Sequence, residues 1–188
     1  MATEKELSDF LKNVEKRAFK RTLYHVRDEE AALDIMQDSM IKLATHYGDK
    51  PPAELPLLFQ RILSNTMLDW FRRRKTRQAL FSNLSDFGAD GDSEEFDLLE
   101  TFQGSSDAEM GESAEDHIRR KQIFQQIEAG IQELPARQRE AFLLRYWEEM
   151  DVSETAAAMG CSEGSVKTHC SRAVHALSRS LKAKGIQP

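Results

Sequence analysis

The chain of 188 residues is short of long apolar runs and of cysteine, and it contains 9 glycines and 5 prolines. No apolar run approaches the roughly 20 residues that a membrane-spanning helix needs. The charged residues 1–6 lack the apolar core of a secretory signal. Two cysteines cannot form a disulfide framework, which favours a reducing compartment. These absences predict a cytoplasmic protein with no direct membrane insertion.

Catalytic and metal-binding patterns are also missing. There is no set of nucleophile, base and orienting residue, no glycine-rich phosphate loop after a strand, and no group of carboxylates on a rigid element. Cys161 and Cys170 are nine residues apart, and neither forms a C-x-x-C pair. His169 beside Cys170 does not complete a metal site. We therefore expect neither an enzyme nor a protein that depends on a cofactor or a metal.

The charge is distributed very unevenly along the chain. The total is −6, from 26 basic and 32 acidic residues. Residues 1–81 carry 15 basic and 12 acidic residues (net +3), and residues 117–188 carry 11 and 8 (net +3). Residues 82–116 carry 12 acidic residues and no basic one, a net charge of −12. The sequence thus predicts two mildly basic domains, 1–81 and 117–188, on either side of one strongly acidic segment.

Residues 82–116 are rich in glycine, serine and acid, and they lack the apolar periodicity that offsets the entropy of ordering. This composition predicts a flexible linker that self-repulsion extends. Two interpretations of the linker stay open. It is a passive tether, or it is an acidic mimic of nucleic acid that occupies a basic channel on a partner. An apolar group within it favours the mimic: Phe96, Leu98, Leu99 and Phe102.

Both flanking segments show apolar residues at intervals of three and four, which predicts an all-α fold. Helices are expected at residues 6–24, from about Asp28 onward, and at 57–74 or slightly beyond. On the second helix, Asp34, Gln37 and Asp38 share one polar face with Lys42. Considered alone, that face is more typical of a solvated surface than of a binding site.

The third helix carries a polar stripe and ends in a cluster of cations. Arg61, Asn65 and Asp69 lie at i, i+4 and i+8, and five of the six residues 72–77 are basic. Helix-dipole complementation rarely requires five cations. Phosphate contacts for the cations and base contacts for Asn65 explain the pattern better. The predicted nucleic-acid residues are Arg61, Asn65, Asp69, Arg72, Arg73, Arg74 and Lys75. Trp70 is expected to lie in the core rather than to stack on bases.

The C-terminal segment predicts a helix-turn-helix. Asp151 and Glu154 form a capping box before a short helix. Gly160 allows a left-handed turn and Ser162 caps the next helix, an arrangement typical of DNA-binding units. That last helix divides into an inner side (Val166, Cys170, Val174 and Leu177) and an outer side (Lys167, Thr168, Ser171, Arg172 and His175). The outer side suits a major groove, and the amide groups of residues 163–165 suit a phosphate.

Together these segments resemble bacterial RNA polymerase sigma factors of the sigma-70 family. Residues 32–43 (ALDIMQDSMIKL) and 59–74 (FQRILSNTMLDWFRRR) resemble the second conserved domain of that family. Residues 134–147 (LPARQREAFLLRYW) and 154–168 (ETAAAMGCSEGSVKT) resemble the fourth. Two such domains and a linker within 188 residues match the small extracytoplasmic-function (ECF) group.

This resemblance implies a role for each predicted site. The face of Asp34, Gln37 and Asp38 is expected to dock on the clamp helices of the polymerase's largest subunit, and the fourth domain on the flap of the second-largest. The stripe from Arg61 to Lys75 would bind and open the minus-ten element, with Asn65 holding a flipped-out base. A further set would read the minus-thirty-five element: Ser165, Lys167, Thr168, Ser171 and Arg172. The resemblance also implies an anti-sigma factor as a partner, and it favours the mimic interpretation of the linker.

Two other classes of protein remain as alternatives. Residues 165–169 also resemble the output domain of LuxR-type regulators, which bind duplex DNA without acting as sigma factors. No receiver-like or ligand-binding pattern precedes that domain, which argues against a regulator. An antagonist that sequesters polymerase would leave Lys167 and Arg172 without a function. The sequence favours a sigma factor, which directs core polymerase to a bipartite promoter and opens the DNA.

Overall fold

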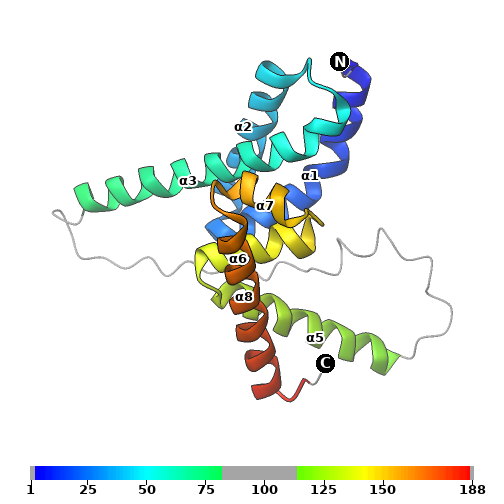
Figure 1. Ribbon diagram of the computed structural model, residues 1–188. Coiled ribbons are helices and arrows are strands. Elements are labelled where there is room, and N and C mark those ends of the chain that lie inside the picture. Colours follow the sequence, from blue (N-terminus) through cyan, green and yellow to red (C-terminus); the bar gives the residue numbers. More distant parts are fainter. Residues whose placement is uncertain (1–2, 82–113, 187–188) are drawn as a thin grey trace.

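The computed structural model describes residues 3–81 and 114–186, and within these ranges it is helical without any strand. Figure 1 shows the helices in chain order. Their bounds are α1 Glu4–Val26, α2 Glu29–Tyr47, η1 Pro52–Glu54, α3 Leu55–Phe81, α5 Ala114–Glu133, α6 Ala136–Phe142, the π-helical turn η2 Leu143–Trp147, α7 Val152–Met159 and α8 Glu163–Ala183. The all-α prediction is confirmed.

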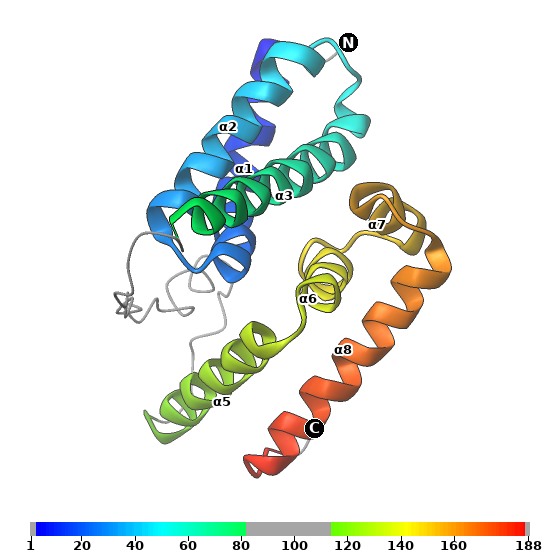
Figure 2. The same ribbon diagram turned by 90° about the vertical axis from the view of Figure 1, so that its left-hand side faces the viewer.

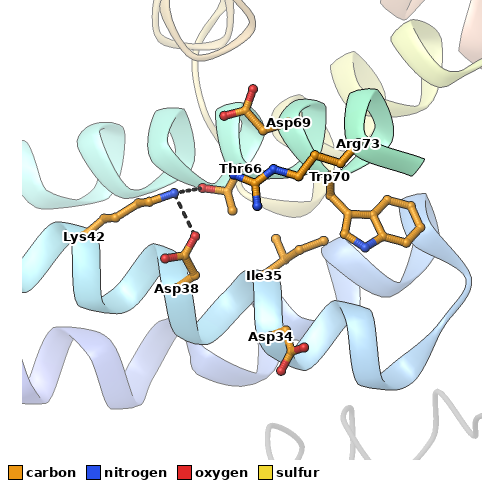
Figure 3. Close-up of a pocket in the computed structure, with 8 residues that line it drawn as sticks. All are labelled: Asp34, Ile35, Asp38, Lys42, Thr66, Asp69, Trp70 and Arg73. Atoms are coloured by element: carbon orange, nitrogen blue, oxygen red, sulfur yellow. Dashed lines mark hydrogen bonds and ion pairs between the residues drawn. The ribbon is translucent and has the colours of Figure 1, made fainter. Parts of the chain in front are cut away.

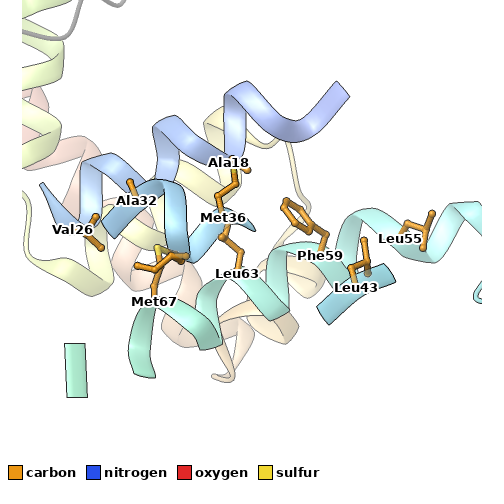
Figure 4. Packing of buried hydrophobic residues seen from close by; sticks show 10 residues of the cluster. Ala18, Val26, Ala32, Met36, Leu43, Leu55, Phe59, Leu63 and Met67 are labelled. Carbon is orange, nitrogen blue, oxygen red and sulfur yellow. The ribbon is translucent and has the colours of Figure 1, made fainter. Parts of the chain in front are cut away.

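Helices α1, α2 and α3 pack into one N-terminal unit. The Thr3 hydroxyl accepts a hydrogen bond from the Glu6 amide, and the Glu6 carboxylate accepts one from the Thr3 amide, so a capping box starts α1. Arg27 ends α1 in the left-handed conformation, and the Asp28 carboxylate caps α2 as predicted. Apolar residues from all three helices meet in one core, which Figure 4 shows around Met36, Phe59 and Leu63.

The C-terminal unit contains α5, α6, η2, α7 and α8. One apolar cluster joins α6, α7 and α8 through residues such as Ala141, Met159 and Val166. A second cluster joins α5, η2 and α8 through Ile131, Leu143 and Leu177. The two clusters hold the short helix α7 and the long helix α8 in fixed relation.

The helix bounds extend beyond the predictions at several ends. Helix α1 runs from Glu4 to Val26 instead of 6–24, and α3 begins at Leu55 instead of 57 and continues past 74 to Phe81. Helix α5 begins at Ala114, so the last three residues of the predicted linker are helical. The rest of the acidic segment, residues 82–113, lies outside the described residues. Helix boundaries depend on packing and capping, which periodicity alone does not locate.

The two units are in direct contact, an arrangement that the sequence did not predict. Helix α7 packs against α3, and α1 packs against both α5 and α6. Figures 1 and 2 show α1, α2 and α3 in the upper part of the molecule, α5 and α8 in the lower part, and α6 and α7 between them.

Candidate polymerase and DNA interfaces

The predicted polymerase-binding face lies on the solvent side of α2. Asp34, Gln37 and Asp38 are all exposed. Their positions follow from helical spacing, because the opposite side of α2 buries Ile35, Met36 and other residues in the core of the N-terminal unit. The structure therefore places the three predicted side chains on one accessible surface.

A groove of about 220 Å³ connects this face with α3. Eight residues line it: Asp34, Ile35, Asp38, Lys42, Thr66, Asp69, Trp70 and Arg73. Figure 3 shows the Lys42 ammonium between the two helices. Its Nζ lies 2.7 Å from the Asp38 carboxylate and donates a 3.3 Å hydrogen bond to the Thr66 hydroxyl. The groove thus brings members of the predicted polymerase face beside members of the predicted minus-ten stripe, a proximity that the sequence did not reveal.

The predicted minus-ten stripe is exposed along α3. Its seven residues, from Arg61 to Lys75, all lie at the surface. The Arg72 guanidinium pairs with the Asp69 carboxylate at 3.1 Å, one turn away. Trp70 is half-buried against the N-terminal core, as predicted, and the Arg74 guanidinium lies 5.2 Å from its ring centroid. This cation–aromatic pair holds the positive charge of Arg74 at the exposed surface of α3.

The helix-turn-helix has the local chemistry that the sequence predicts. The Asp151 carboxylate accepts from the Glu154 amide at 2.8 Å, and the Glu154 carboxylate accepts from the Asp151 amide at 2.8 Å. Gly160 adopts φ 62° and ψ 42°, the left-handed conformation that glycine favours. Ser162 then caps α8 by accepting from the Ser165 amide at 3.2 Å. Each of these interactions orients α8 relative to α7.

The outer side of α8 presents Lys167, Thr168, Ser171 and Arg172 to solvent. Ser165 is half-buried, and its amide and hydroxyl both contact the Ser162 hydroxyl. Its amide is therefore already engaged, which removes one of the three groups expected to bind phosphate. The Thr168 hydroxyl donates to the Gly164 carbonyl at 3.0 Å.

One predicted inner position is wrong. Val174 of α8 is 44% exposed, and its neighbour Ala173 is fully buried instead. Tyr146, which lies in the π-helical turn η2, is 56% exposed. A π-helical turn rotates the following side chains away from their α-helical directions.

A network of buried cations between the two units is the feature that sequence reasoning missed. Arg21 is fully buried and donates to the Gln60 amide oxygen (2.5 Å) and the Ser64 hydroxyl (2.7 Å). Arg139 donates to four backbone carbonyls, those of Tyr24 (3.0 Å), Ile131 (3.0 Å), Gln132 (2.5 Å) and Leu134 (2.8 Å). Burial lowers the pKa of both guanidinium groups. The sequence signals the burial of Arg139 only through spacing. Arg139 precedes the buried Leu143 by four residues, so the two share one face of a helix.

Cysteine and membrane features add little to the site. Cys170 is buried and its thiol lies 3.6 Å from the Ala141 carbonyl oxygen, while Cys161 is half-buried. Burial raises the pKa of the Cys170 thiol, which suits a small core residue. Within residues 3–81 and 114–186 there is no group of three metal-ligating side chains. In the same ranges no helix has the length and apolar character to cross a bilayer.

Several known proteins are similar to this chain in sequence. The model of the family Sigma-70, region 4 matches residues 124–177, which include the helix-turn-helix. The RNA polymerase sigma-E factor of Streptomyces avermitilis is 27% identical over 164 residues, covering 86% of this chain and 76% of that protein. The sigma factor SigV of Bacillus subtilis is 26% identical over 151 residues, covering 80% of this chain and 75% of that protein.

The fold is similar to a solved structure as well. The sigma factor RpoE of Bartonella quintana, crystallised with the anti-sigma factor NepR, aligns with a TM-score of 0.62 over 93% of this chain and 97% of that chain, at 20% identity. Over most of its length the chain is thus similar to RNA polymerase sigma factors of the sigma-E and SigV kind, and residues 124–177 match the Sigma-70, region 4 family. Because the sigma-E match covers 86% of the chain, it must extend over most of the N-terminal unit. The alternative of a LuxR-like regulator is therefore not favoured.

Proposed function

We propose that the protein is a transcription initiation factor that binds core RNA polymerase, directs it to a bipartite promoter and opens the DNA there. The observation that carries this proposal is the pairing of two exposed DNA-type helical surfaces on separate units. One is the cationic stripe of α3 and the other is the outer side of α8. The polymerase performs the chemistry, and we expect no catalysis by this chain itself.

The acidic face of α2 is the proposed contact with the clamp helices of the polymerase's largest subunit. Asp34, Gln37 and Asp38 are accessible, and the adjoining groove is lined by three carboxylates and by Trp70, beside the cations Lys42 and Arg73. Such a groove suits a basic side chain, because carboxylates pair with cations and an indole ring attracts them. The intramolecular pair between Asp38 and Lys42 would then exchange partners on docking.

DNA contacts are divided between the two units in this proposal. Residues 1–81 would bind the minus-ten element through Arg61, Asn65, Asp69 and the cations at 72–75. Residues 117–188 would read the minus-thirty-five element through Ser165, Lys167, Thr168, Ser171 and Arg172, while the same unit contacts the flap of the second-largest subunit. Cations on phosphates supply affinity, and side chains on base edges supply specificity. An anti-sigma factor is a further proposed partner, and the linker is a nucleic-acid mimic or a passive tether.

Run-off transcription with purified core polymerase and a library of genomic fragments tests this function. We expect promoter-specific transcripts from the wild-type protein. The double variant Lys167→Ala/Arg172→Ala should reduce promoter affinity by about 1–3 kcal/mol for each lost base contact. Arg119→Ala, which removes an exposed cation from α5, is the matched control and should leave transcription unchanged.

The polymerase contact has its own test in the same system. Asp34→Ala/Asp38→Ala should weaken binding to immobilised core polymerase, whereas Glu15→Ala on α1 should not. The absence of any promoter-specific transcript from all fragments would refute the sigma function. Equal transcription by the Lys167→Ala/Arg172→Ala variant would instead show that promoter selection does not depend on the outer side of α8.

A further inference from the structure

The polar face of α8 continues well beyond the residues predicted to read the minus-thirty-five element. Thr168 and Arg172 are followed on the same side by His175, Arg179 and Lys182, the last of them 14 residues after Thr168. At 3.6 residues per turn, these five side chains lie within about 80° of the helix circumference. All five are exposed. The outer side of α8 is therefore one continuous stripe, and only its first half has a proposed role so far.

Positive charge is concentrated in this part of the C-terminal unit. Residues 164–188 contain five basic residues and no acidic one, whereas residues 117–163 contain six basic and eight acidic residues. Lys182 lies in the last turn of α8, where a cation complements the helix dipole. The dipole does not account for Arg179, which precedes that turn, or for the alignment of both cations with Arg172. We call Arg179 and Lys182 the distal stripe.

The distal stripe belongs to a well-anchored part of the helix. On the opposite side of α8, Ala173 and Leu177 are buried in the cluster that α8 shares with α5. A Cβ on Gly130 of α5 would lie 2.9 Å from Leu177 Cδ2, so glycine lets the two helices approach closely there. The Ile186 amide closes the end of α8 by donating to the Leu181 carbonyl at 3.0 Å. Figure 2 shows α8 as one unbroken helix from α7 to its end, so the distal stripe keeps a fixed direction relative to the recognition residues.

The length of α8 places the distal stripe outside the major groove. In the proposed function, on which this inference rests, the residues from Ser165 to Arg172 lie in the groove, and they span about 10 Å along the helix axis. The groove is about 12 Å wide. Arg179 and Lys182 lie about 10 and 15 Å beyond Arg172 along the same axis. Because helix-turn-helix proteins insert the N-terminal part of the recognition helix, the later turns pass over the phosphate strand that bounds the groove.

We propose that the distal stripe binds the phosphate backbone beside the minus-thirty-five element, outside the base pairs that the protein reads. Guanidinium and ammonium groups pair strongly with phosphate oxygens. Such contacts carry no sequence information, but they add affinity and fix the position of the helix on the duplex. The protein therefore covers a longer stretch of DNA than it reads. The competing occupant of the stripe, an acidic protein surface, would leave the affinity for DNA independent of Arg179 and Lys182.

Three variants of the full-length chain test the proposal. Arg179→Gln/Lys182→Gln neutralises the distal stripe, whereas Arg179→Lys/Lys182→Arg exchanges the two side chains and keeps their charge. Arg119→Gln/Arg120→Gln is the matched control, because it removes two exposed charges from α5 of the same unit. Every substitution is at the surface, and circular dichroism verifies that each protein retains its helices.

Fluorescence anisotropy with a random duplex of about 30 base pairs, over a salt series, gives the first measurement. Each phosphate contact contributes about 0.9 to the slope of log K against log salt, so the neutral variant should lose about 1.8 of that slope. Its loss of affinity relative to the wild type should be about twelvefold larger at 50 mM salt than at 200 mM. The exchange variant and the α5 control should keep the wild-type slope.

An unchanged slope in Arg179→Gln/Lys182→Gln would overturn the DNA contact and leave the distal stripe to an acidic protein surface. An equal loss of slope in Arg119→Gln/Arg120→Gln would contradict the proposal as well, because it would reduce the effect to the net charge of the unit.

A promoter recovered by run-off transcription gives the second measurement. Duplexes carry its minus-thirty-five element either without a flank or with added base pairs on one side or the other. We expect an added flank on one of the two sides to raise the affinity of the wild type about tenfold, and that of Arg179→Gln/Lys182→Gln not at all. The neutral variant should still prefer the promoter over a random duplex as strongly as the wild type does, whereas Lys167→Ala/Arg172→Ala should lose that preference.

The two measurements separate this inference from the proposed function. Equal gains from the flank in the wild type and the neutral variant would refute the contact. A lost promoter preference in the neutral variant would refute its sequence-independent role and assign the two residues to base reading. If no protein supports promoter-specific transcription, the proposed function fails, and the salt slope on the random duplex still decides whether the distal stripe contacts phosphates.

Discussion

At the scale of single residues, buried charge is what distinguishes this chain from a simple pair of helical units. Arg21 has no exposed surface, yet its guanidinium has polar partners on α3 and a carboxylate 3.9 Å away on α6. Removing one partner of such a group leaves the others buried and unsatisfied, which costs more than the pair itself contributes. The arrangement therefore fixes how α1, α3 and α6 meet.

His25 provides a pH test of the same region. Its ring is buried, and its pKa is held well below the usual value by desolvation and then by the positive charges of Arg21 and Arg139. Because the unfolded state binds a proton near pH 6.5 and the folded state does not, stability falls as the pH drops below that value. Relative to His25→Gln, the wild-type protein should lose about 2 kcal/mol of unfolding free energy between pH 7 and pH 5.

Urea unfolding of the two proteins at both pH values measures this difference. Burial raises the pKa of Glu148, so that carboxyl contributes a change of opposite sign as the pH falls. It is present in both proteins and cancels when they are compared. Identical pH dependence in the wild type and His25→Gln would show that His25 is accessible to protons in the folded protein.

At the scale of elements, the turn between α7 and α8 determines how the recognition surface is presented. It depends on one capping box, one left-handed glycine and one serine cap, each identified by its residue type and spacing. Because the turn is short, its backbone conformation sets the direction in which α8 leaves α7. By contrast, the orientation of α8 beyond Cys170 depends on which of its residues pack against α5 and η2. In that part of the helix Val174 is exposed, although periodicity predicts that it faces inward.

Gly160 tests the requirement for this turn. A Cβ at this position would meet no atom within 4 Å, so the effect of a substitution is conformational and not steric crowding by neighbours. Gly160→Ala should lower the unfolding free energy by about 1 kcal/mol, because alanine disfavours the left-handed conformation. Gly160→Asn should cost less than half as much, since asparagine tolerates it. Thermal melting of the three proteins would contradict this account if alanine and asparagine were equivalent.

At the scale of the whole molecule, the distribution of charge matters more than its sum. The net −6 arises because a segment of −12 outweighs two units of +3 each. The basic units carry exposed cations along α3 and α8. We expect the acidic segment tethered to them to compete with nucleic acid for those cations, since its effective concentration would be high. The free protein is therefore expected to bind random DNA weakly.

Neutralising the acidic segment tests this competition. Replacing the ten acidic residues within residues 82–113 by Asn or Gln changes the net charge from −6 to +4. We expect the affinity for a random duplex to rise at least tenfold at low ionic strength and to fall steeply with added salt. Fluorescence anisotropy over a salt series measures the affinity for the random duplex. Ser→Asn changes in the same segment, which leave its charge unaltered, serve as the control. An unchanged affinity would leave the segment as a passive tether.

The sequence by itself determined the helical class, the caps of α2, α7 and α8, and the exposure of the predicted polymerase and DNA residues other than Ser165. These features follow from local rules, because helical spacing divides inner from outer side chains and caps satisfy amide groups nearby in the chain. The face of Asp34, Gln37 and Asp38 and the outer side of α8 were found in this way. Their roles in binding remain predictions.

Only the tertiary structure decided that the two units meet, that Tyr24 and Leu57 serve the core of the other unit, and that Arg21 and Arg139 lie buried between them. Contacts between residues some 100 positions apart leave no periodic signal in the chain, and an arginine between polar neighbours has the same local pattern whether it meets water or four carbonyl groups. Burial of charge depends on partners that the fold alone brings together.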